Sequence, residues 1–260
     1  MSGAGAGGGK AAPKVAIVTG GGQGLGRGIA IAMSDAGFRV ALFGRTLSKL
    51  ETTAALCAGE CLPVACDLTD PDQVRAAFAR VEEAWDRLDV LVNNAASYAA
   101  FDLAEARDEQ VVDVVTQSLI APMFCARQAV IAMRRSGGGD IVNISTQSVL
   151  TPQPTMIVYS AAKGGLDVFS QGLRNEFRGE NIRVLTVQIG VVADSVLDTS
   201  DPDGAAKYMA GLQKAGLEKA FVFPGSKPAD IAASIVHAVT APRNTVIEQI
   251  VIRGFEGPVG

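Results

Sequence analysis

Two residues that could together move a proton lie four positions apart in the run YSAAK: Tyr159 and Lys163. On a helix, residues at this spacing share one face, so the phenol and the ammonium would be neighbours. A free phenol has a pKa near ~10 and is a poor base at neutral pH, but a cation beside it favours the phenolate. The pair could therefore give a proton to a carbonyl oxygen or take one from an alcohol. An inert Tyr–Lys pair on an exposed helix would have the same spacing.

A glycine-rich run near the N-terminus could bring the backbone close to a phosphate group. Gly20, Gly22, Gly24 and Gly26 follow the apolar run at residues 14–19 and precede a helical pattern. Without Cβ atoms in the way, backbone N–H groups and the helix N-terminus could face a pyrophosphate. A tight turn alone could require the same glycines, and the spacing is not that of G-x-G-x-x-G. Because the run follows the first strand of an alternating chain, we interpret it as a nucleotide-binding loop.

The elements that would position these groups alternate along the chain from Lys14 onward. Seven β-branched runs predict strands at residues 14–19, 39–43, 62–66, 89–93, 140–145, 182–189 and 246–252. Helical patterns lie between them, near residues 24–36, 46–58, 71–85, 107–135, 156–178 and 228–240. Continuous apolar strands separated by helices of crossover length indicate a parallel sheet covered on both faces. We therefore predict an α/β protein with a doubly wound, Rossmann-type domain and a seven-stranded parallel sheet.

Two segments depart from this alternation. Residues 1–13 are rich in Gly and Ala and lack the apolar core of a secretory signal, so we expect a flexible tail. Residues 14–260 would then form a single domain. Residues 191–225 form the one long interruption of the α/β pattern. Such an insertion in a compact domain is usually functional, and it predicts a lid over the substrate.

The composition disfavours several classes of protein. Lys and Arg number 23 against 27 Asp and Glu, which gives a net charge of −4 and no basic surplus to neutralise nucleic-acid phosphates or an anionic membrane surface. Arg127 and Gln128 interrupt the most apolar stretch before it reaches the ~18 residues of a membrane span. We expect a cytoplasmic protein that binds a small molecule, with no nucleic acid and no membrane as partner.

The cysteines and the histidine do not form a recognisable metal motif. Cys57, Cys61 and Cys66 could in principle bind a metal, but their spacing is not that of a zinc site. Cys125 is remote in sequence, and His237 lies on the apolar face of a predicted helix. We expect no metal and assign these residues to packing.

Several motifs, in order along the chain, resemble the short-chain dehydrogenase/reductase family. TGGGQGLG at residues 19–26 is similar to TGxxxGxG, NNAA at 93–96 is similar to NNAG, and YSAAK at 159–163 matches YxxxK. The resemblance extends from about residue 14 to 253. It implies an NADP-dependent oxidoreductase in which hydride passes between a nicotinamide and a ketone or secondary alcohol. It also implies that Tyr159 is the general acid/base and that Lys163 tunes it.

The resemblance further assigns the cofactor-binding residues, including Asp67 and Leu68 beside an adenine. At the end of the second strand, an acidic residue would bind a ribose 2′-OH and repel a 2′-phosphate. This chain has Gly44 and Arg45 there, and Thr46 adds a hydroxyl, which favours NADP(H), although Arg45 could be only a solvated charge. The residues expected to contact the cofactor are Gly20, Gln23, Gly24, Leu25, Gly26, Arg45, Thr46, Asp67, Leu68, Asn94, Ala95, Tyr159, Lys163, Gly190 and Val192.

One departure from the family pattern concerns the hydroxyl that orients the substrate oxygen. The family has a Ser thirteen residues before the Tyr, and counting back from Tyr159 gives Thr146. Threonine keeps the hydroxyl and adds a methyl, which makes the pocket smaller. Ser145 and Ser148 are the competing hydroxyls, and a shifted loop would favour Ser148.

Two further departures lie at Ser118 and Ile189. Ser118 stands where the family has an Asn that bends the helix and holds a relay water below the Lys. Ile189 precedes Gly190 where Pro-Gly is usual, and Asp194 stands in place of a Thr near the cofactor phosphates. We therefore expect the catalytic group to comprise Tyr159, Lys163, Thr146 and Ser118.

The resemblance places the substrate between the loops at 96–101 and 147–156 and the lid. The candidate lining residues are Tyr98, Phe101, Ser148, Gln153, Met156, Tyr208, Met209 and Phe221. This mostly apolar set favours a ketone or secondary alcohol over a charged substrate, although Tyr208 and Met209 could equally pack the lid. An acidic acyl-carrier protein would need a basic patch, whereas Arg174, Glu176, Arg178 and Glu180 form a mixed face.

Two functional hypotheses remain. The first is an NADP(H)-dependent oxidoreductase, and the second is a catalytically weak nucleotide-binding sensor or scaffold of the same fold, which the three departures make credible. The low charged fraction of 19% also bears on assembly. The predicted helices 107–135 and 156–178 are too apolar for a solvated outer face, so we expect a homotetramer or at least a homodimer.

Overall fold

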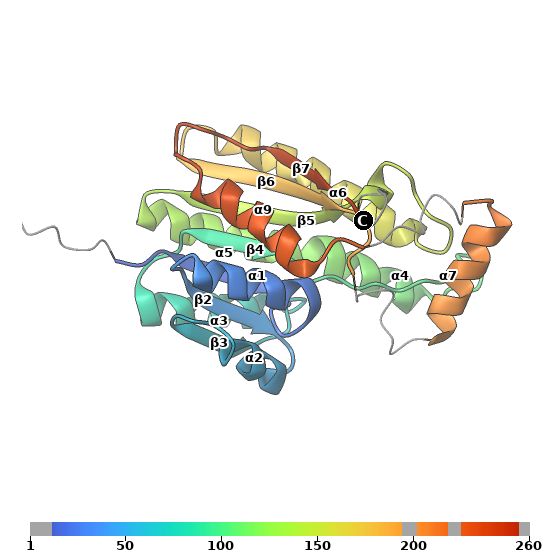
Figure 1. Ribbon diagram of the computed structural model, residues 1–260, viewed down its shortest axis with the longest axis horizontal. Coiled ribbons are helices and arrows are strands. Elements are labelled where there is room, and N and C mark those ends of the chain that lie inside the picture. Colours follow the sequence, from blue (N-terminus) through green and yellow to red (C-terminus); the bar gives the residue numbers. More distant parts are fainter. Residues whose placement is uncertain (1–11, 194–201, 218–224, 255–260) are drawn as a thin grey trace, which may run out of the picture.

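The computed structural model describes residues 12–193, 202–217 and 225–254, and in this part of the chain seven parallel strands form one sheet between two helix layers (Figure 1). The strand order is β3-β2-β1-β4-β5-β6-β7, so the order reverses between β1 and β4. The predicted α/β fold with a seven-stranded parallel sheet is confirmed. The strands are β1 (Val15–Thr19), β2 (Arg39–Gly44), β3 (Cys61–Ala65), β4 (Val90–Asn93), β5 (Gly139–Thr146), β6 (Ile182–Ile189) and β7 (Gln249–Ile252).

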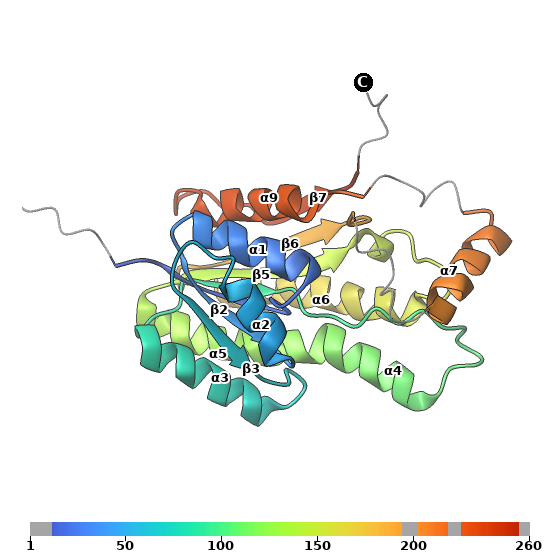
Figure 2. The same cartoon turned by 60° about the horizontal axis from the view of Figure 1, so that its bottom comes forward.

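Two apolar clusters cover the faces of the sheet. On one face, α1 (Gly24–Asp35) and α9 (Pro228–Thr240) pack side by side, with Leu50 of α2 (Leu47–Ala54) joining them. On the other face lie α3 (Pro71–Trp85), α5 (Ala121–Ser136) and α6 (Ile157–Glu176). Figure 2 shows the two layers on opposite sides of the strands. Both faces of the central strands are therefore buried, which explains their nearly continuous apolar sequences.

The predicted helix at 107–135 is one continuous helical segment with a change of geometry inside it. It consists of α4 (Asp108–Val115), a π-helical stretch η1 (Thr116–Ile120) and α5. By length and composition the segment Asp108–Ser136 would suffice to cross a membrane. However, α5 buries Cys125, Ala129 and Met133 in the cluster under the sheet, as a core helix does.

Two other predicted boundaries were too wide. The helix expected at 46–58 ends at Ala54, after which Gly59 N–H donates to Ser34 Oγ at 2.8 Å as the chain turns toward β3. The last strand, expected from residue 246, begins at Gln249, and Val246 is exposed. In both cases apolar residues continue in the sequence beyond the end of the helix or strand, and the pattern therefore predicted an element that was too long.

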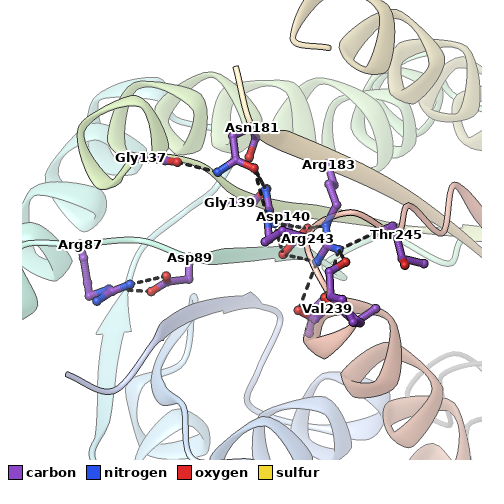
Figure 3. Close-up of polar contacts among 12 residues, drawn as sticks. Arg87, Asp89, Gly137, Gly139, Asp140, Asn181, Arg183, Val239, Arg243 and Thr245 are labelled. Carbon is purple, nitrogen blue, oxygen red and sulfur yellow. Dashed lines mark hydrogen bonds and ion pairs between the residues drawn. The ribbon is translucent and has the colours of Figure 1, made fainter. Parts of the chain in front are cut away.

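At the amino ends of the strands, a buried aspartate holds several elements together (Figure 3). Asp140, at the start of β5, accepts hydrogen bonds from Arg183 Nε at 2.6 Å and from Arg243 Nη1 at 3.0 Å. Arg183 also donates to backbone oxygens of Val239 and Thr245, and so ties β6 to the end of α9 and to the loop before β7. A buried carboxylate is stabilising only with such complete pairing. Because this cluster lies at the amino ends of the strands, the carboxyl ends remain available for a binding site.

The predicted lid is described in part. Residues 202–217 contain helix α7 (Pro202–Lys214), and Tyr208 Oη donates to Gln153 Oε1 at 2.6 Å, which joins α7 to the loop before α6. The expectations for Asp194 and Phe221 and for the tail at residues 1–11 lie outside the described residues.

Candidate active site

The glycine turn lies at the carboxyl end of β1, where the backbones of two segments meet. Thr19 Oγ1 accepts hydrogen bonds from the N–H groups of Asn94 and Ala95 at 2.9 and 3.0 Å, and Asn94 Nδ2 donates to Thr19 O at 3.0 Å. A Cβ on Gly26 would lie 2.2 Å from Gly20 O and 2.6 Å from Asn94 Nδ2. Only glycine permits this approach. The contacts join the turn after β1 to the NNAA segment after β4.

The start of α1 has the features of a phosphate site. Helix α1 begins at Gly24, whose φ is +52° and whose Cβ position faces open space. Gln23 is the N-cap residue, but its side chain makes no capping hydrogen bond, and the first turn contains no acidic residue. The free N–H groups and the helix dipole therefore favour an anion at this end. The chain's own residues thus fit the pyrophosphate of a dinucleotide, with Leu25 buried beneath the turn.

The end of β2 carries exposed cations beside that turn. Gly44 ends the strand, Arg45 is exposed, and Thr46 immediately precedes α2. Lys49 Nζ donates to Gln23 Oε1 at 2.8 Å, so a second cation reaches across to the glycine turn. Arg45 and Lys49 together make this corner positive.

Asp67 and Leu68 follow β3 and have local structural partners. Asp67 Oδ1 accepts from Thr69 N and Thr69 Oγ1 at 2.9 and 2.8 Å, and Leu68 packs into the core cluster. The Asp67 carboxylate is thus already hydrogen-bonded within its own turn.

Tyr159 and Lys163 lie in the first two turns of α6 and are both buried. Tyr159 is 2% exposed and Lys163 is 1% exposed. Lys163 Nζ lies 5.9 Å from the centroid of the Tyr159 ring and donates to Ile144 O at 2.7 Å. The ring of Tyr98 lies 4.9 Å from that of Tyr159 and covers it from the side of the loop after β4. This is a buried pair and not a pair on an exposed helix.

Burial dominates the electrostatics of this pair. It raises the pKa of Tyr159 well above its usual value, Tyr98 raises it further, and the hydroxyl of Thr146 lowers it. Burial also lowers the pKa of Lys163 to about 8, while the charge of Asp167 acts in the opposite direction. The sequence led us to expect an ammonium that favours the phenolate. In the structure the ammonium donates to a backbone carbonyl, and desolvation keeps Tyr159 protonated.

The three hydroxyls that competed for the substrate-orienting position differ in their surroundings. Thr146 ends β5, its Oγ1 accepts from Ser148 N at 3.2 Å, and it acts on Tyr159. Ser148 Oγ and Ser145 Oγ are buried without a hydrogen-bond partner in the described part of the chain. Thr146 is therefore the hydroxyl for which an interaction with Tyr159 is found.

Ser118 lies in the π-helical stretch η1 and is fully buried. Its Oγ accepts from Ser97 N at 3.3 Å, in the loop that carries Tyr98. π-Helical turns inside α-helices occur frequently at functional sites. The helix thus deviates at the expected position although serine has replaced asparagine.

The segment after β6 also reaches this edge of the sheet. Ile189 is a buried strand residue, and Gly190 N donates to Ile252 O at 2.8 Å. Val192 forms a parallel bridge with Ser226. β6 thus ends at Ile189, where the family usually has proline, and this residue lies in register with Ile252 of β7.

The residues predicted to line a substrate pocket partly form one cluster. Phe101 and Met156 are buried with Tyr159, and Tyr208 of α7 packs against them, whereas Met209 is exposed. Gln153 joins the cluster through Tyr208. Sequence reasoning missed Asp167, although its position four residues after Lys163 was the available signal. The carboxyl ends of the strands point toward α7 (Figure 1), and the cluster joins α7 to α6 and to the loop after β4.

Comparison with known proteins agrees with this geometry. Residues 14–204 match the family described as short chain dehydrogenase. The chain belongs to the short-chain dehydrogenase/reductase family. The members of this family are oxidoreductases that use a nicotinamide cofactor and act on small molecules.

Individual relatives share between about a quarter and a third of their residues with this chain. An uncharacterized oxidoreductase of Staphylococcus aureus is 24% identical over 92% of this chain and 96% of its own length. Human 3-oxoacyl-[acyl-carrier-protein] reductase is 33% identical over 69% of this chain and 76% of its own length.

Solved structures of the family match over nearly the full chain. A metagenomic short-chain oxidoreductase in complex with NADP has a TM-score of 0.76 at 26% identity, and covers 94% of this chain and 98% of its own. A short-chain dehydrogenase from Streptomyces avermitilis has a TM-score of 0.80 at 27% identity, over 94% of this chain and 89% of its own.

Gly26→Ala tests the close approach at the glycine turn. The added Cβ would force Gly20 and Asn94 apart, so we expect a loss of roughly 2 kcal/mol or more of stability and at least tenfold weaker dinucleotide binding. Thermal melting and fluorescence titration with NADPH measure the two effects. Gly172→Ala is the matched control, because its Cβ meets nothing within 4 Å on α6 and alanine favours the helix. Equal behaviour of the two variants would contradict the role of Gly26.

Proposed function

We propose that this short-chain dehydrogenase/reductase interconverts a ketone and a secondary alcohol with NADP(H), and that Tyr159 is the general acid/base. The observation that carries the proposal is the buried Tyr159–Lys163 pair on α6. Tyr159 belongs to the apolar cluster, against which Ala96 of the NNAA segment packs, and that segment contacts the glycine turn. A buried phenol next to a buried ammonium has no packing advantage over apolar residues of similar size. Two buried ionisable groups side by side are typical of a proton-transfer site.

Four residues of the chain would each have a separate role in this reaction. The nicotinamide, when bound, supplies or accepts the hydride. Tyr159 Oη holds the proton that the carbonyl oxygen receives, and Thr146 Oγ1 orients that oxygen. Lys163 lowers the cost of the phenolate that remains, and Ser118 stabilises the loop carrying Tyr98 through Ser97. The protonated state that burial imposes on Tyr159 suits carbonyl reduction, where this residue acts first as an acid.

Preference for NADP(H) follows from the charge at the end of β2. Gly44 offers no carboxylate to bind a 2′-OH or to repel a 2′-phosphate, and Arg45, Thr46 and Lys49 offer donors. The related metagenomic oxidoreductase was found in complex with NADP. In this proposal Asp67 and Leu68 would contact the adenine of the cofactor, and Asn94 and Ala95 would contact a ribose. Gly190 and Val192 would contact the carboxamide of the nicotinamide.

The substrate would be a moderately apolar carbonyl compound. Phe101, Met156 and Tyr208 surround Tyr159, the Tyr98 ring lies beside it, and Gln153 accepts from Tyr208 Oη. Tyr98, Gln153 and Ser148 would supply the polar atoms of the proposed substrate site. An acyl-carrier protein fits less well, despite the similarity to the human reductase. At the end of α6, Arg174 donates to backbone oxygens of Val184 and Glu248, and Glu180 pairs with Arg134, so these residues form no basic patch.

The proposed setting is the cytoplasm, with a small molecule as partner. The apolar helix Asp108–Ser136 takes part in the core, and the net charge of −4 offers no electrostatic attraction to nucleic acid or an anionic membrane.

Tyr159→Phe tests the acid/base assignment. Its hydroxyl makes no hydrogen bond of normal geometry in the described part of the chain, so its removal should not destabilise the fold. We expect kcat for ketone reduction to fall by about 10²–10⁴-fold while the Kd for NADPH changes less than threefold. A panel of ketones with NADPH, followed at 340 nm, measures the effect.

Retained activity in Tyr159→Phe would contradict the mechanism. Tight NADPH binding by the wild-type protein without activity on any ketone would instead favour the sensor or scaffold hypothesis.

Arg45→Ala tests the cofactor preference. We expect the wild-type protein to prefer NADPH over NADH by at least tenfold in kcat/KM, and the variant to lose tenfold or more of that preference, because one charged hydrogen bond contributes roughly 1.5–3 kcal/mol. Arg80→Ala, an exposed arginine on α3, is the control with the same charge change. A tenfold preference of the wild-type protein for NADH would overturn the assignment.

We also propose a homotetramer, or at least a homodimer, built on α4, α5 and α6. Large apolar side chains on these helices are exposed: Val112, Ile131, Ile157 and Val168, at 63%, 41%, 41% and 68%. Light scattering at micromolar concentration should give a mass of two or four times 26.8 kDa. Val168→Glu should shift it toward the monomer, whereas Leu56→Glu, on the loop after α2, should not. A monomeric wild-type protein would contradict this proposal.

A further inference from the structure

The side of α6 that faces the sheet is polar along much of its length. Lys163, Asp167, Ser170 and Arg174 follow one another at helical spacing, and the facing strands present Asn143 and Ser145 of β5 and Thr186 and Gln188 of β6. Most of these groups have neutral partners. Asn143 Nδ2 donates to Ser170 Oγ at 2.8 Å, and Arg174 Nη1 donates to Val184 O and Glu248 O at 3.2 Å.

Asp167 is the exception in this seam. Its Oδ2 accepts from Gln188 Nε2 at 2.7 Å, but its Oδ1 is buried and has no hydrogen-bond partner among the described residues. Gln188 is 4% exposed, so water does not compensate the pair from that side. A carboxylate removed from water with one neutral donor is costly unless a cation lies nearby.

The cation that meets this requirement is Lys163, one helical turn earlier. Residues at i and i+4 have Cβ atoms about 6 Å apart on the same face. Lys163 has one acceptor, Ile144 O, in the described part of the chain, and it is otherwise enclosed. Burial lowers the pKa of Lys163 to about 8, and the Asp167 charge is the opposing influence. The buried ammonium and the partly buried carboxylate are too far apart for an ion pair, but the Asp167 charge still acts electrostatically on Lys163.

The other groups around Lys163 do not substitute for Asp167. Tyr159 on α6 and Tyr98 on the loop after β4 are ionisable, but desolvation raises the pKa of both phenols. Neither therefore supplies a negative charge at neutral pH. Strands β5 and β6 present Thr146, Ser145 and Gln188, and η1 presents Ser118, none of which carries a charge. Arg174, two turns beyond Asp167, is engaged with β6 and Glu248. On α4, Asp113 is hydrogen-bonded to Gln117 Nε2 at 2.8 Å and faces solvent.

We propose that Asp167, held by Gln188, is a positioning residue that keeps Lys163 in its ammonium form through neutral pH. The inference rests on the proposed roles of Tyr159 and Lys163 and adds a carboxylate behind them. Asp167 does not touch the reacting atoms in this scheme. It acts through Lys163, and Gln188 fixes the carboxylate from β6.

The sign of the effect follows from the charges. Without the Asp167 carboxylate, burial acts on Lys163 unopposed, so the pKa of Lys163 falls below about 8. The neutral amine then replaces the ammonium at lower pH, and the phenolate left by Tyr159 loses its countercharge. Activity at pH 6 should be largely preserved, because Lys163 is protonated there in either protein. Activity at pH 8 should fall.

The test compares Asp167→Asn with wild type in two measurements. The first is the pH profile of kcat/KM for NADPH-dependent ketone reduction, whose basic limb should move to lower pH by about one unit. The second is a ¹³Cε-lysine NMR titration of the full-length protein, with the Lys163 signal assigned by Lys163→Met. This titration reports the protonation of Lys163 whether or not the protein turns over a substrate.

Three further variants separate charge from structure. Asp167→Glu should restore most of the wild-type profile, and Gln188→Met should give a smaller shift because it loosens the carboxylate but leaves its charge. Glu176→Gln removes the same charge from the exposed end of α6, about 20 Å along the helix axis from Lys163, and should change nothing.

Two outcomes would overturn the proposal. An unchanged Lys163 titration in Asp167→Asn would show that Asp167 does not control the lysine. A loss of kcat/KM of equal size at every pH, with an unchanged basic limb, would assign Asp167 a purely structural role. Absence of all carbonyl reduction in the wild-type protein would refute the proposed function, while the NMR titration would still decide the role of Asp167.

Discussion

The contact on which the site depends is the close approach of Gly26 to Gly20 O and Asn94 at the carboxyl end of β1. It occurs where the strand order reverses, between β1 and β4, and it holds the segments after these two strands together before the chain continues to helices on opposite faces of the sheet. Ligands of doubly wound folds bind at this reversal. Thr19 Oγ1 fixes both N–H groups of the NNAA segment, and Gly26 lets α1 begin directly against them. Any side chain at Gly26 would separate the turn from β4.

A second constraint is the competition between burial and charge around Tyr159. Burial raises the pKa of the phenol and lowers that of Lys163, so each group is driven toward its neutral form. In the proposed reduction, neutral Tyr159 would be the acid, and the phenolate formed afterwards would need the ammonium of Lys163. Asp167 behind Lys163 and Thr146 beside Tyr159 act against desolvation. In the proposed reaction, proton transfer by Tyr159 would thus depend on residues that do not themselves exchange the proton.

The departures from the family pattern have local structural explanations. Ser118 keeps the helix irregular through η1 and binds the backbone of the loop that carries Tyr98. Ile189 is buried in β6 and lies in register with Ile252 of β7. Thr146 keeps a hydroxyl that interacts with Tyr159. None of the three removes the buried Tyr–Lys pair or the glycine turn.

The sequence by itself determined the order of elements, the parallel sheet and the positions of the motifs, because strand composition, helix period and glycine spacing are local properties. It also predicted that Tyr159 and Lys163 share a helix face. Only the tertiary structure decided how deeply that pair is buried, that Lys163 donates to Ile144 O, and that Tyr98 covers Tyr159. The π-helical turn at Ser118 and the Asp167–Gln188 bond also depend on packing between elements distant in sequence. Desolvation is set by everything that surrounds a group, and no spacing along the chain encodes it.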